Sequence, residues 1–442
     1  MDNASIKNYA FILGRERELC LAELKALLGR FCFGFNISSV TDNVIFINID
    51  KGAEDVAKLS KALGGTIKIF EVIGNSGDPK TAITNYIKEN VRSEGRMTFG
   101  ISAYEPEHLN LTIRNLNQLG FKIKKELKGL DISSRFLELK ESTEVSTILS
   151  LKEKLIGKGL EFGIFPNALG VLVGLSNPEE WNIRDYEKPA GDKYSGMLPP
   201  KLARMMVNLA LGHINSEQIQ SSKIEEESKQ VVIPAKAGIQ EGFDLDSGSQ
   251  ASGRNDKADV LVVDPFCGSG NVLTEALMLG CSVFGSDISD KSVSDSIENI
   301  EWLANKYQIK KLEFKVVKAD ATGDDFCSLI GPSKCRLAIV TEPYLGEPKK
   351  FKPSKSATIG EYRKIADMYL AFFKNFSKLK LDKPVFCVVF PLIETIEGRR
   401  FSVYRECVDE IKKIGYTELQ SPLIYGRDYQ VVKREISLLT LN

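Results

Sequence analysis

The chain has 442 residues, enough for two or three domains that each bury a core. Its eight cysteines are scattered without a C-x-x-C pair and it has only two histidines, which argues against a disulfide scaffold or a zinc ribbon. Its net charge is zero, no run of about 18 apolar residues predicts a membrane span, and the amino terminus lacks the pattern of a secretion signal. We therefore expect a cytoplasmic protein that binds neither a membrane nor a metal.

Residues 1–60 predict an α/β unit, and residues 61–175 predict an α+β binding module. In the first, strands YAFILG (9–14) and NVIFINI (43–49) flank an amphipathic helix over 16–29. In the second, the predicted strands are 66–73, 96–104, 135–140, 161–165 and 169–175. The predicted helices there are 82–92, 108–120 and 146–157.

Basic residues are concentrated between Arg114 and Lys158, where the sequence contains ten Lys or Arg and six acids. The densest part is FKIKKELK (121–128), and phosphate contacts depend on such side chains. One interpretation is RNA contact; the alternative is an ordinary solvated face. The candidate RNA-binding residues here are Lys124, Lys125, Lys128 and Arg135.

Residues 176–215 predict a linker and a lead-in helix, in which LPPKLARMM (198–206) places Lys201 and Arg204 one helical turn apart. That face either borders a target nucleotide or is simply solvated. Residues 216–257 are rich in Ser, Gln, Gly and charge, and we expect a disordered insertion there.

The segment VLVVDPFCGSGNVLTEA (260–276) predicts a strand, a tight glycine loop and a helix, the order in which a parallel sheet forms a nucleotide pocket. The loop lacks both the third glycine of a dinucleotide fingerprint and the lysine of a phosphate-binding loop. An acid at the strand end, Asp264, suits a ligand with cationic and hydroxyl groups. Cys267 in the loop is interpreted as a buried packing residue rather than a nucleophile.

Further predicted strands end near acids: one at Asp287, one at Asp320 and one at Thr341-Glu342. The acid at 287, some twenty residues beyond the glycine loop, is placed to accept hydrogen bonds from ribose hydroxyls. Helix capping also puts acids after strands, which is the competing interpretation.

These motifs resemble the class I S-adenosylmethionine-dependent methyltransferases, and within them the amino-group methylases. The lead-in 184–210, FGISAY (99–104), the Ser134-Arg135 neighbourhood and the strand 429–439 resemble the THUMP-containing tRNA guanine-10 N2-methyltransferases. The resemblance implies a Rossmann-like α/β catalytic domain over 258–442, a THUMP-type RNA-binding region over 61–175, tRNA as partner, and S-adenosylmethionine as cofactor. It leaves open whether a small activator protein is a further partner. The implied cofactor-binding residues are Asp264, Pro265, Phe266, Gly268, Ser269, Gly270, Asp287, Ile288, Asp320 and Ala321.

The catalytic motif departs from the family's T-D-P-P-Y-G, because this chain has T-E-P-Y-L-G at 341–346. One register puts Glu342 in the acid position; the other puts Thr341 there and keeps Pro343-Tyr344 aligned. We favour Glu342 as acceptor for the target amine and Tyr344 as stacking partner of the base. Two alternatives are an amino-methylase of another nucleic acid, such as DNA adenine N6 or ribosomal RNA guanine N2, and a non-catalytic RNA-binding protein.

Overall fold

The computed structural model describes residues 6–31, 33–90, 95–191, 197–226, 260–309, 313–323, 326–330, 335–378, 383–427 and 429–442. The chain divides into two compact units. The first comprises Met1–Arg17 and Cys32–Glu180, and the second comprises Glu18–Phe31 and Trp181–Asn442.

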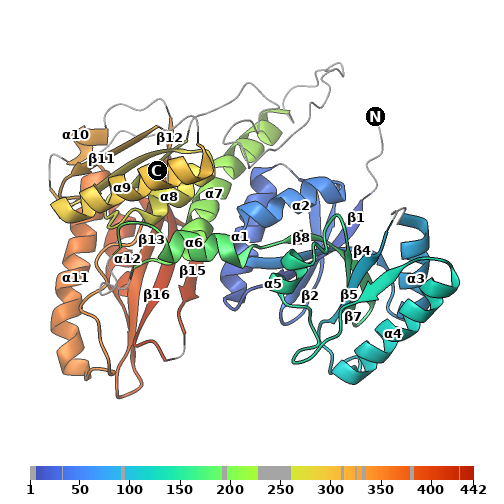
Figure 1. Cartoon of the computed structure of the whole chain (residues 1–442). Helices are drawn as coiled ribbons and strands as arrows, with labels where there is room; N and C mark the ends of the chain where they lie inside the picture. The colour runs from blue at the N-terminus through green and yellow to red at the C-terminus, as the bar shows by residue number, and fades with distance from the viewer. Residues whose placement is uncertain are drawn as a thin grey trace. The chain divides into compact units, whose positions relative to one another are not determined.

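The first unit contains a mixed eight-stranded sheet with the order β2-β3-β1-β4-β8-β7-β5-β6 (Figure 1). Its strands are β1 (Lys7–Leu13), β2 (Phe35–Val40), β3 (Val44–Ile49), β4 (Thr66–Gly74), β5 (Met97–Ala103), β6 (Ser134–Phe136), β7 (Leu160–Phe165) and β8 (Ala168–Leu175). Its helices are α2 (Ala53–Ala62), α3 (Pro79–Asn90), α4 (Ile113–Gly129) and α5 (Thr147–Lys152). One sheet therefore runs through both of the regions expected over 1–60 and 61–175, because β1 pairs with β4.

Helix α4 begins later and ends later than the expected helix over 108–120. The Thr112 hydroxyl accepts a hydrogen bond from the Asn115 backbone N–H, and the Asn115 side chain bonds back to the Thr112 backbone in a capping box. This cap fixes the start of the helix at residue 113, so the basic segment 121–128 is helical.

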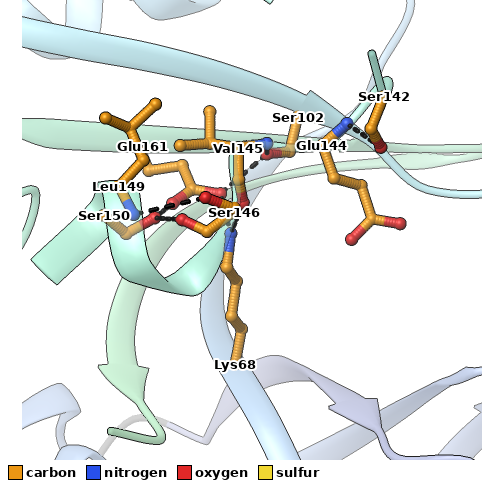
Figure 2. Close-up of polar contacts among 9 residues, drawn as sticks. All are labelled: Lys68, Ser102, Ser142, Glu144, Val145, Ser146, Leu149, Ser150 and Glu161. Carbon is orange, nitrogen blue, oxygen red and sulfur yellow. Dashed lines mark hydrogen bonds and ion pairs between the residues drawn. The ribbon is translucent and has the colours of Figure 1, made fainter. Parts of the chain in front are cut away.

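A buried polar cluster joins α5 and its preceding turn to the sheet of the first unit (Figure 2). Lys68 on β4 donates hydrogen bonds to Glu161 on β7 and to the Val145 carbonyl, both at 2.5 Å. The Glu161 carboxylate also accepts from Ser102 at 2.7 Å and from Ser150 at 2.6 Å. Because Glu161 is 0% exposed, its charge is balanced by these partners rather than by water.

The second unit contains a sheet with the order β11-β10-β9-β12-β13-β16-β15, with β14 paired to β13 (Figure 1). Its strands are β9 (Val260–Asp264), β10 (Ser282–Asp287), β11 (Phe314–Lys318), β12 (Arg336–Thr341), β13 (Val385–Glu394), β14 (Arg400–Ser402), β15 (Tyr416–Tyr425) and β16 (Val432–Leu441). Its helices are α1 (Arg17–Arg30), α6 (Pro178–Tyr186), α7 (Pro200–Glu226), α8 (Asn271–Met278), α9 (Asp290–Tyr307), α10 (Phe326–Ile330), α11 (Lys355–Phe376) and α12 (Val403–Ile414).

Strands β9 to β13 of this sheet are parallel, whereas β16 is antiparallel to β13. Helices α7, α8 and α9 cover one face, and α11 and α12 pack an aromatic core on the other (Figure 1). This is a doubly wound Rossmann-like sheet, so the fold class expected for 258–442 is confirmed. Parallel strands bring Asp264, Asp287 and Thr341 to the same edge.

Helix α1 packs with the second unit although the sequence places it in the first 60 residues. The Asn208 side chain on α7 donates a buried hydrogen bond to Glu23 on α1 at 2.7 Å. A Cβ atom added at Gly212 would lie 2.5 Å from the Cβ of Ala26, so this glycine permits the close helix contact.

Helix α7 continues to residue 226, beyond the point where the insertion over 216–257 was expected to begin, and residues 227–259 lie outside the described residues. None of the helices in the described part of the chain is long and apolar enough to cross a bilayer.

Candidate active site

A cavity of about 730 Å³ lies at the carboxyl edge of the second unit's parallel strands. It is lined by the glycine loop after β9, the ends of β10, β11 and β12, and the segment before α7. The predicted residues it brings together are Asp264, Pro265, Phe266, Gly268, Ser269, Asp287, Ile288, Asp320, Ala321, Glu342, Pro343 and Tyr344. Gly270 belongs to the glycine loop and Thr341 is the last residue of β12, but neither lines the cavity.

The glycine loop is held open by its backbone conformation. Gly268 has φ +51° and Gly270 has φ +82°, values that L side chains rarely adopt. A Cβ atom at Gly268 would meet nothing within 4 Å, so a ligand can approach this backbone closely. The Ser296 hydroxyl donates to the Gly268 carbonyl at 2.8 Å and fixes the loop from α9.

Asp287 links the glycine loop to the end of β10. Its carboxylate accepts the Gly268 backbone N–H at 3.0 Å and the Ser289 N–H at 2.9 Å. Each oxygen keeps a further lone pair for a ligand hydroxyl. The side chain of the next residue, Ile288, is 69% exposed and gives the cavity an apolar wall.

The cavity is acidic. Its lining among the described residues contains one cation, Lys291, which is ion-paired to Asp295 at 2.5 Å. The lining acids are Asp264, Asp287, Asp295, Asp320 and Glu342. Such a set of acceptors fits a cationic, hydroxyl-bearing ligand and does not fit a diphosphate.

Burial raises the pKa of Asp264 to about 7, although hydrogen bonds from the Thr341 hydroxyl and the Phe266 N–H oppose the shift. The Thr341 Oγ1 donates to Asp264 Oδ1 at 2.6 Å. The negative charges of Asp287 and Glu342 raise the pKa further. Asp264 therefore changes its charge near neutral pH.

Burial also raises the pKa of the Cys267 thiol, which is consistent with a packing residue rather than a nucleophile. The seven cysteines within the described ranges are all free thiols. No cluster of three or more His, Cys, Asp or Glu able to hold a metal occurs within those ranges.

The segment before α7 also lines the cavity, a role that the sequence did not predict for it. Met197 and Leu198 contribute side chains, and the Ser269 hydroxyl lies 3.4 Å from the Met197 sulfur. Asn271 at the start of α8 donates to the Leu198 carbonyl at 2.6 Å and accepts from Lys188 at 2.5 Å. The sequence feature that could have indicated this role is Asn271, an amide side chain directly after the glycine loop.

Glu342 is held by a cation that the sequence analysis did not identify. Arg434 on β16 forms a two-point ion pair with it, Nε bonding Oε2 and Nη2 bonding Oε1 at 3.1 Å. The Glu342 side chain is 14% exposed and lines the cavity, so the pair is mostly desolvated. Thr341 is completely buried, and its hydroxyl is committed to Asp264. Tyr344 is half-exposed at the cavity, with its hydroxyl donating to Glu347 at 3.1 Å.

The prediction that Arg204 contacts RNA is not supported. Its side chain is 3% exposed, and it forms a buried ion pair with Glu275 on α8 at 2.6 Å. Arg184 shares the same carboxylate at 2.7 Å. The helix face that carries Arg204 is thus turned inward toward a charged partner. Lys201 is exposed, with its ammonium 5.6 Å from the centre of the Trp181 ring.

A second cavity, of about 600 Å³, lies in the first unit beside α4. Lys124, Lys125 and Lys128 all line it, together with Arg96 and the half-exposed ring of Phe121. The Ser134 hydroxyl in its wall is buried and has no hydrogen-bond partner among the described residues. Arg135 does not line this cavity, and it is ion-paired with Glu153 at 2.9 Å.

The chain is similar to two curated proteins named tRNA (guanine(10)-N2)-dimethyltransferase. The one from Methanothermobacter thermautotrophicus is 25% identical over 398 residues, 87% of this chain and 90% of that protein. The one from Methanocaldococcus jannaschii is 29% identical over 180 residues, 39% of this chain and 37% of that protein. Among solved structures, a possible methylase from Clostridium difficile 630 covers 98% of both chains at 13% identity, with a TM-score of 0.45. No protein-family model matches the chain.

Proposed function

We propose that this protein is an S-adenosylmethionine-dependent methyltransferase that methylates the exocyclic N2 amine of a guanosine in tRNA. The observation that carries the proposal is that one acidic cavity is lined by both the open glycine loop and Glu342-Pro343-Tyr344. The similarity to two tRNA guanine-N2 dimethyltransferases supports the choice of tRNA and of guanine N2.

The residues present fit S-adenosylmethionine, which when bound supplies an electrophilic methyl group. Asp264 and Asp287 would accept hydrogen bonds from its ammonium and from its ribose hydroxyls, and the open backbone at Gly268 would lie against the bound cofactor. Ile288 would pack on the apolar face of its adenine, beside Asp320 and Ala321.

Glu342 and Tyr344 would position the target base. The guanine N2 lone pair is delocalised into the ring, so the amine must be oriented before it can attack. The Glu342 carboxylate would accept one N2–H and stabilise the positive charge that develops on nitrogen. Arg434 acts as a positioning residue, because its two-point pair fixes the carboxylate at the cavity wall. Pro343 leaves its carbonyl as a second acceptor, and the exposed Tyr344 ring is available for stacking.

Cofactor affinity is expected to rise with pH, because a cationic ligand prefers the ionised form of Asp264, whose pKa is about 7 in the unliganded protein. From about pH 5.5 to 7.5 the affinity should increase roughly ten- to thirtyfold as the ionised fraction grows. Calorimetry at several pH values measures this. The matched control is the Asp264→Asn variant, because any titration of the ligand itself affects both proteins equally. Its cofactor affinity should be nearly independent of pH. Equal slopes for the two proteins would contradict the role of Asp264.

The first unit is proposed to contact the tRNA phosphates through Lys124, Lys125 and Lys128. Neutralising all three with glutamine should flatten the dependence of log Kd on log salt concentration by about 2 to 3, since each lost phosphate contact removes about 0.7 to 0.9. Filter binding of tRNA over a salt series is the measurement. An Arg135→Gln variant serves as comparison, because Arg135 is ion-paired and does not line this cavity. An unchanged slope in the triple variant would show that this face is only solvated.

The substrate class is tested by incubating the protein and labelled S-adenosylmethionine with equal amounts of bulk tRNA, ribosomal RNA and duplex DNA. The proposal predicts label in tRNA. Label in ribosomal RNA or DNA instead would support an amino-methylase of another nucleic acid. RNA binding without transfer to any substrate would support the non-catalytic protein.

A further inference from the structure

A group of exposed basic side chains follows the T-E-P-Y segment and has no part in the proposed chemistry. Three of them, Lys350, Lys352 and Lys355, follow the cavity-lining segment in the chain and reach the first residue of α11. The other two, Arg399 and Arg400, come at the end of the turn between β13 and β14. These five residues are called the basic rim. Glu394 and Glu397 are the acids interspersed with them in these two segments, so the rim has an excess of three positive charges.

The two segments form one surface. The Ile396 backbone N–H donates to the Pro353 carbonyl at 3.0 Å, which joins the β13–β14 turn to the loop before α11. Lys352 is ion-paired with Glu394 at 2.9 Å. The hydrogen bond from Lys352 lowers the pKa of Glu394, and the charges of Arg400 and Lys433 lower it further, so these cations gather round one carboxylate.

The same surface carries apolar side chains that protrude into solvent. Phe351 is 83% exposed and lies two residues before Pro353. Ile396, whose backbone N–H donates to the Pro353 carbonyl, is 67% exposed. An exposed aromatic ring between cations is the arrangement that binds single-stranded nucleic acid, with bases stacked on the ring and phosphates held by the cations. A protein partner would favour a larger apolar area with fewer charges.

The rim is close to the cavity. Pro348 lines the cavity and Phe351 follows three residues later, so their Cα atoms are at most about 11 Å apart. Backbone phosphates of one stacked nucleic-acid strand recur about every 3.4 Å along the helix axis, so this distance corresponds to at most about three stacked nucleotides. A base that enters the cavity must leave its stack, and the strand beside it must then be held in an unstacked path.

We propose that the basic rim binds the RNA strand immediately beside the target nucleotide, with Phe351 stacking on a neighbouring base and Lys355, Arg399 and Arg400 contacting its phosphates. This inference rests on the proposed function, because it takes the cavity to receive an RNA base. It gives the second unit an RNA-binding surface that is separate from the α4 cavity.

The test compares the triple variant Lys355→Gln, Arg399→Gln, Arg400→Gln with a control triple, Lys364→Gln, Lys374→Gln, Lys412→Gln. The control residues are exposed cations of α11 and α12. The rim triple is expected to flatten the salt dependence of tRNA binding by about 2 and to raise KM for tRNA at least tenfold, with kcat and cofactor affinity retained. The control triple should match the parent in each respect. Equal slopes and KM values for the two triples would overturn the proposal.

Phe351 has its own test. Phe351→Ala should raise KM for tRNA about tenfold, whereas Phe351→Tyr, which keeps the stacking ring, should restore the parent value. Equal KM values for both variants and the parent would overturn the stacking role. If the parent protein transfers no methyl group to any RNA, the proposed function fails, while the salt dependence of binding still tests the rim independently.

Discussion

Replacing Glu342 with glutamine is expected to reduce turnover on tRNA by roughly 10²-fold or more, with cofactor affinity nearly unchanged. The glutamine keeps the size of the side chain but loses the negative charge that stabilises the cationic nitrogen in the transition state. Single-turnover kinetics at saturating cofactor and RNA measure the effect. A thermal melt and calorimetry with cofactor show whether the variant is folded, since it leaves Arg434 without its carboxylate partner.

Two further variants separate this role from a general disturbance of the loop. Glu347→Gln changes a nearby exposed carboxylate that bonds the Tyr344 hydroxyl, and it should stay near parent activity. Thr341→Val removes the hydrogen bond to Asp264, so it should weaken cofactor binding near pH 7 and leave saturated turnover almost intact. If Thr341→Val lowers saturated turnover more than Glu342→Gln does, the register that places Thr341 in the acid position is favoured instead.

Replacing Lys68 with methionine is expected to destabilise the first unit by about 3 to 5 kcal/mol. The change leaves the Glu161 charge completely buried, with only the hydroxyls of Ser102 and Ser150 to solvate it (Figure 2). Urea unfolding followed by circular dichroism measures the loss, and the transition of each unit is analysed separately because a two-unit chain need not unfold in one step.

Two controls identify the buried charge as the cause. Lys80→Met removes a lysine from an exposed pair with Glu126, whose atoms are 2.8 Å apart, and should change the stability far less than Lys68→Met does. The double variant Lys68→Met, Glu161→Gln removes both charges and should be more stable than Lys68→Met alone. A double variant as unstable as the sum of the two single variants would contradict this explanation.

The sequence predicted which strand ends and which glycine loop meet at one edge of the sheet, because those signals are local. Asp264 and Asp287 each end a short apolar run, and parallel strands bring such ends to one edge whatever the rest of the chain does. Gly268 was recognisable because a tight loop between strand and helix needs a left-handed residue. The resemblance of the lead-in segment to known methylases predicted a lead-in helix, but not that Met197 and Leu198 line the cavity.

The contacts that the sequence could not predict join residues far apart in the chain. Arg434 lies 92 residues from Glu342, and nothing in either local pattern pairs them. The face of α7 with Arg204 was expected to border a target nucleotide or solvent, because its partner, Glu275, belongs to another helix. Helix α1 was expected to form an α/β unit with the strands of residues 1–60, because its contacts with α7, which assign it to the second unit, have no local signal.

The two surfaces proposed to contact RNA could be predicted only in part. The lysines of 121–128 stood out by density alone, and α4 brings three of them to one cavity. The basic rim did not stand out, because its charges are divided between residues 350–355 and 399–400 and are mixed with acids in the sequence. The pairing of β13 with β14, the Ile396–Pro353 hydrogen bond and the Lys352–Glu394 ion pair bring them together.

The most direct test of the central claim is mass spectrometry of nucleosides from bulk tRNA that has been incubated with the protein and isotopically labelled S-adenosylmethionine. The proposed function predicts labelled N2-methylguanosine or N2,N2-dimethylguanosine, and their loss with the Glu342→Gln variant. Label on another nucleoside, or none on tRNA from a protein that still binds both cofactor and tRNA, would contradict it.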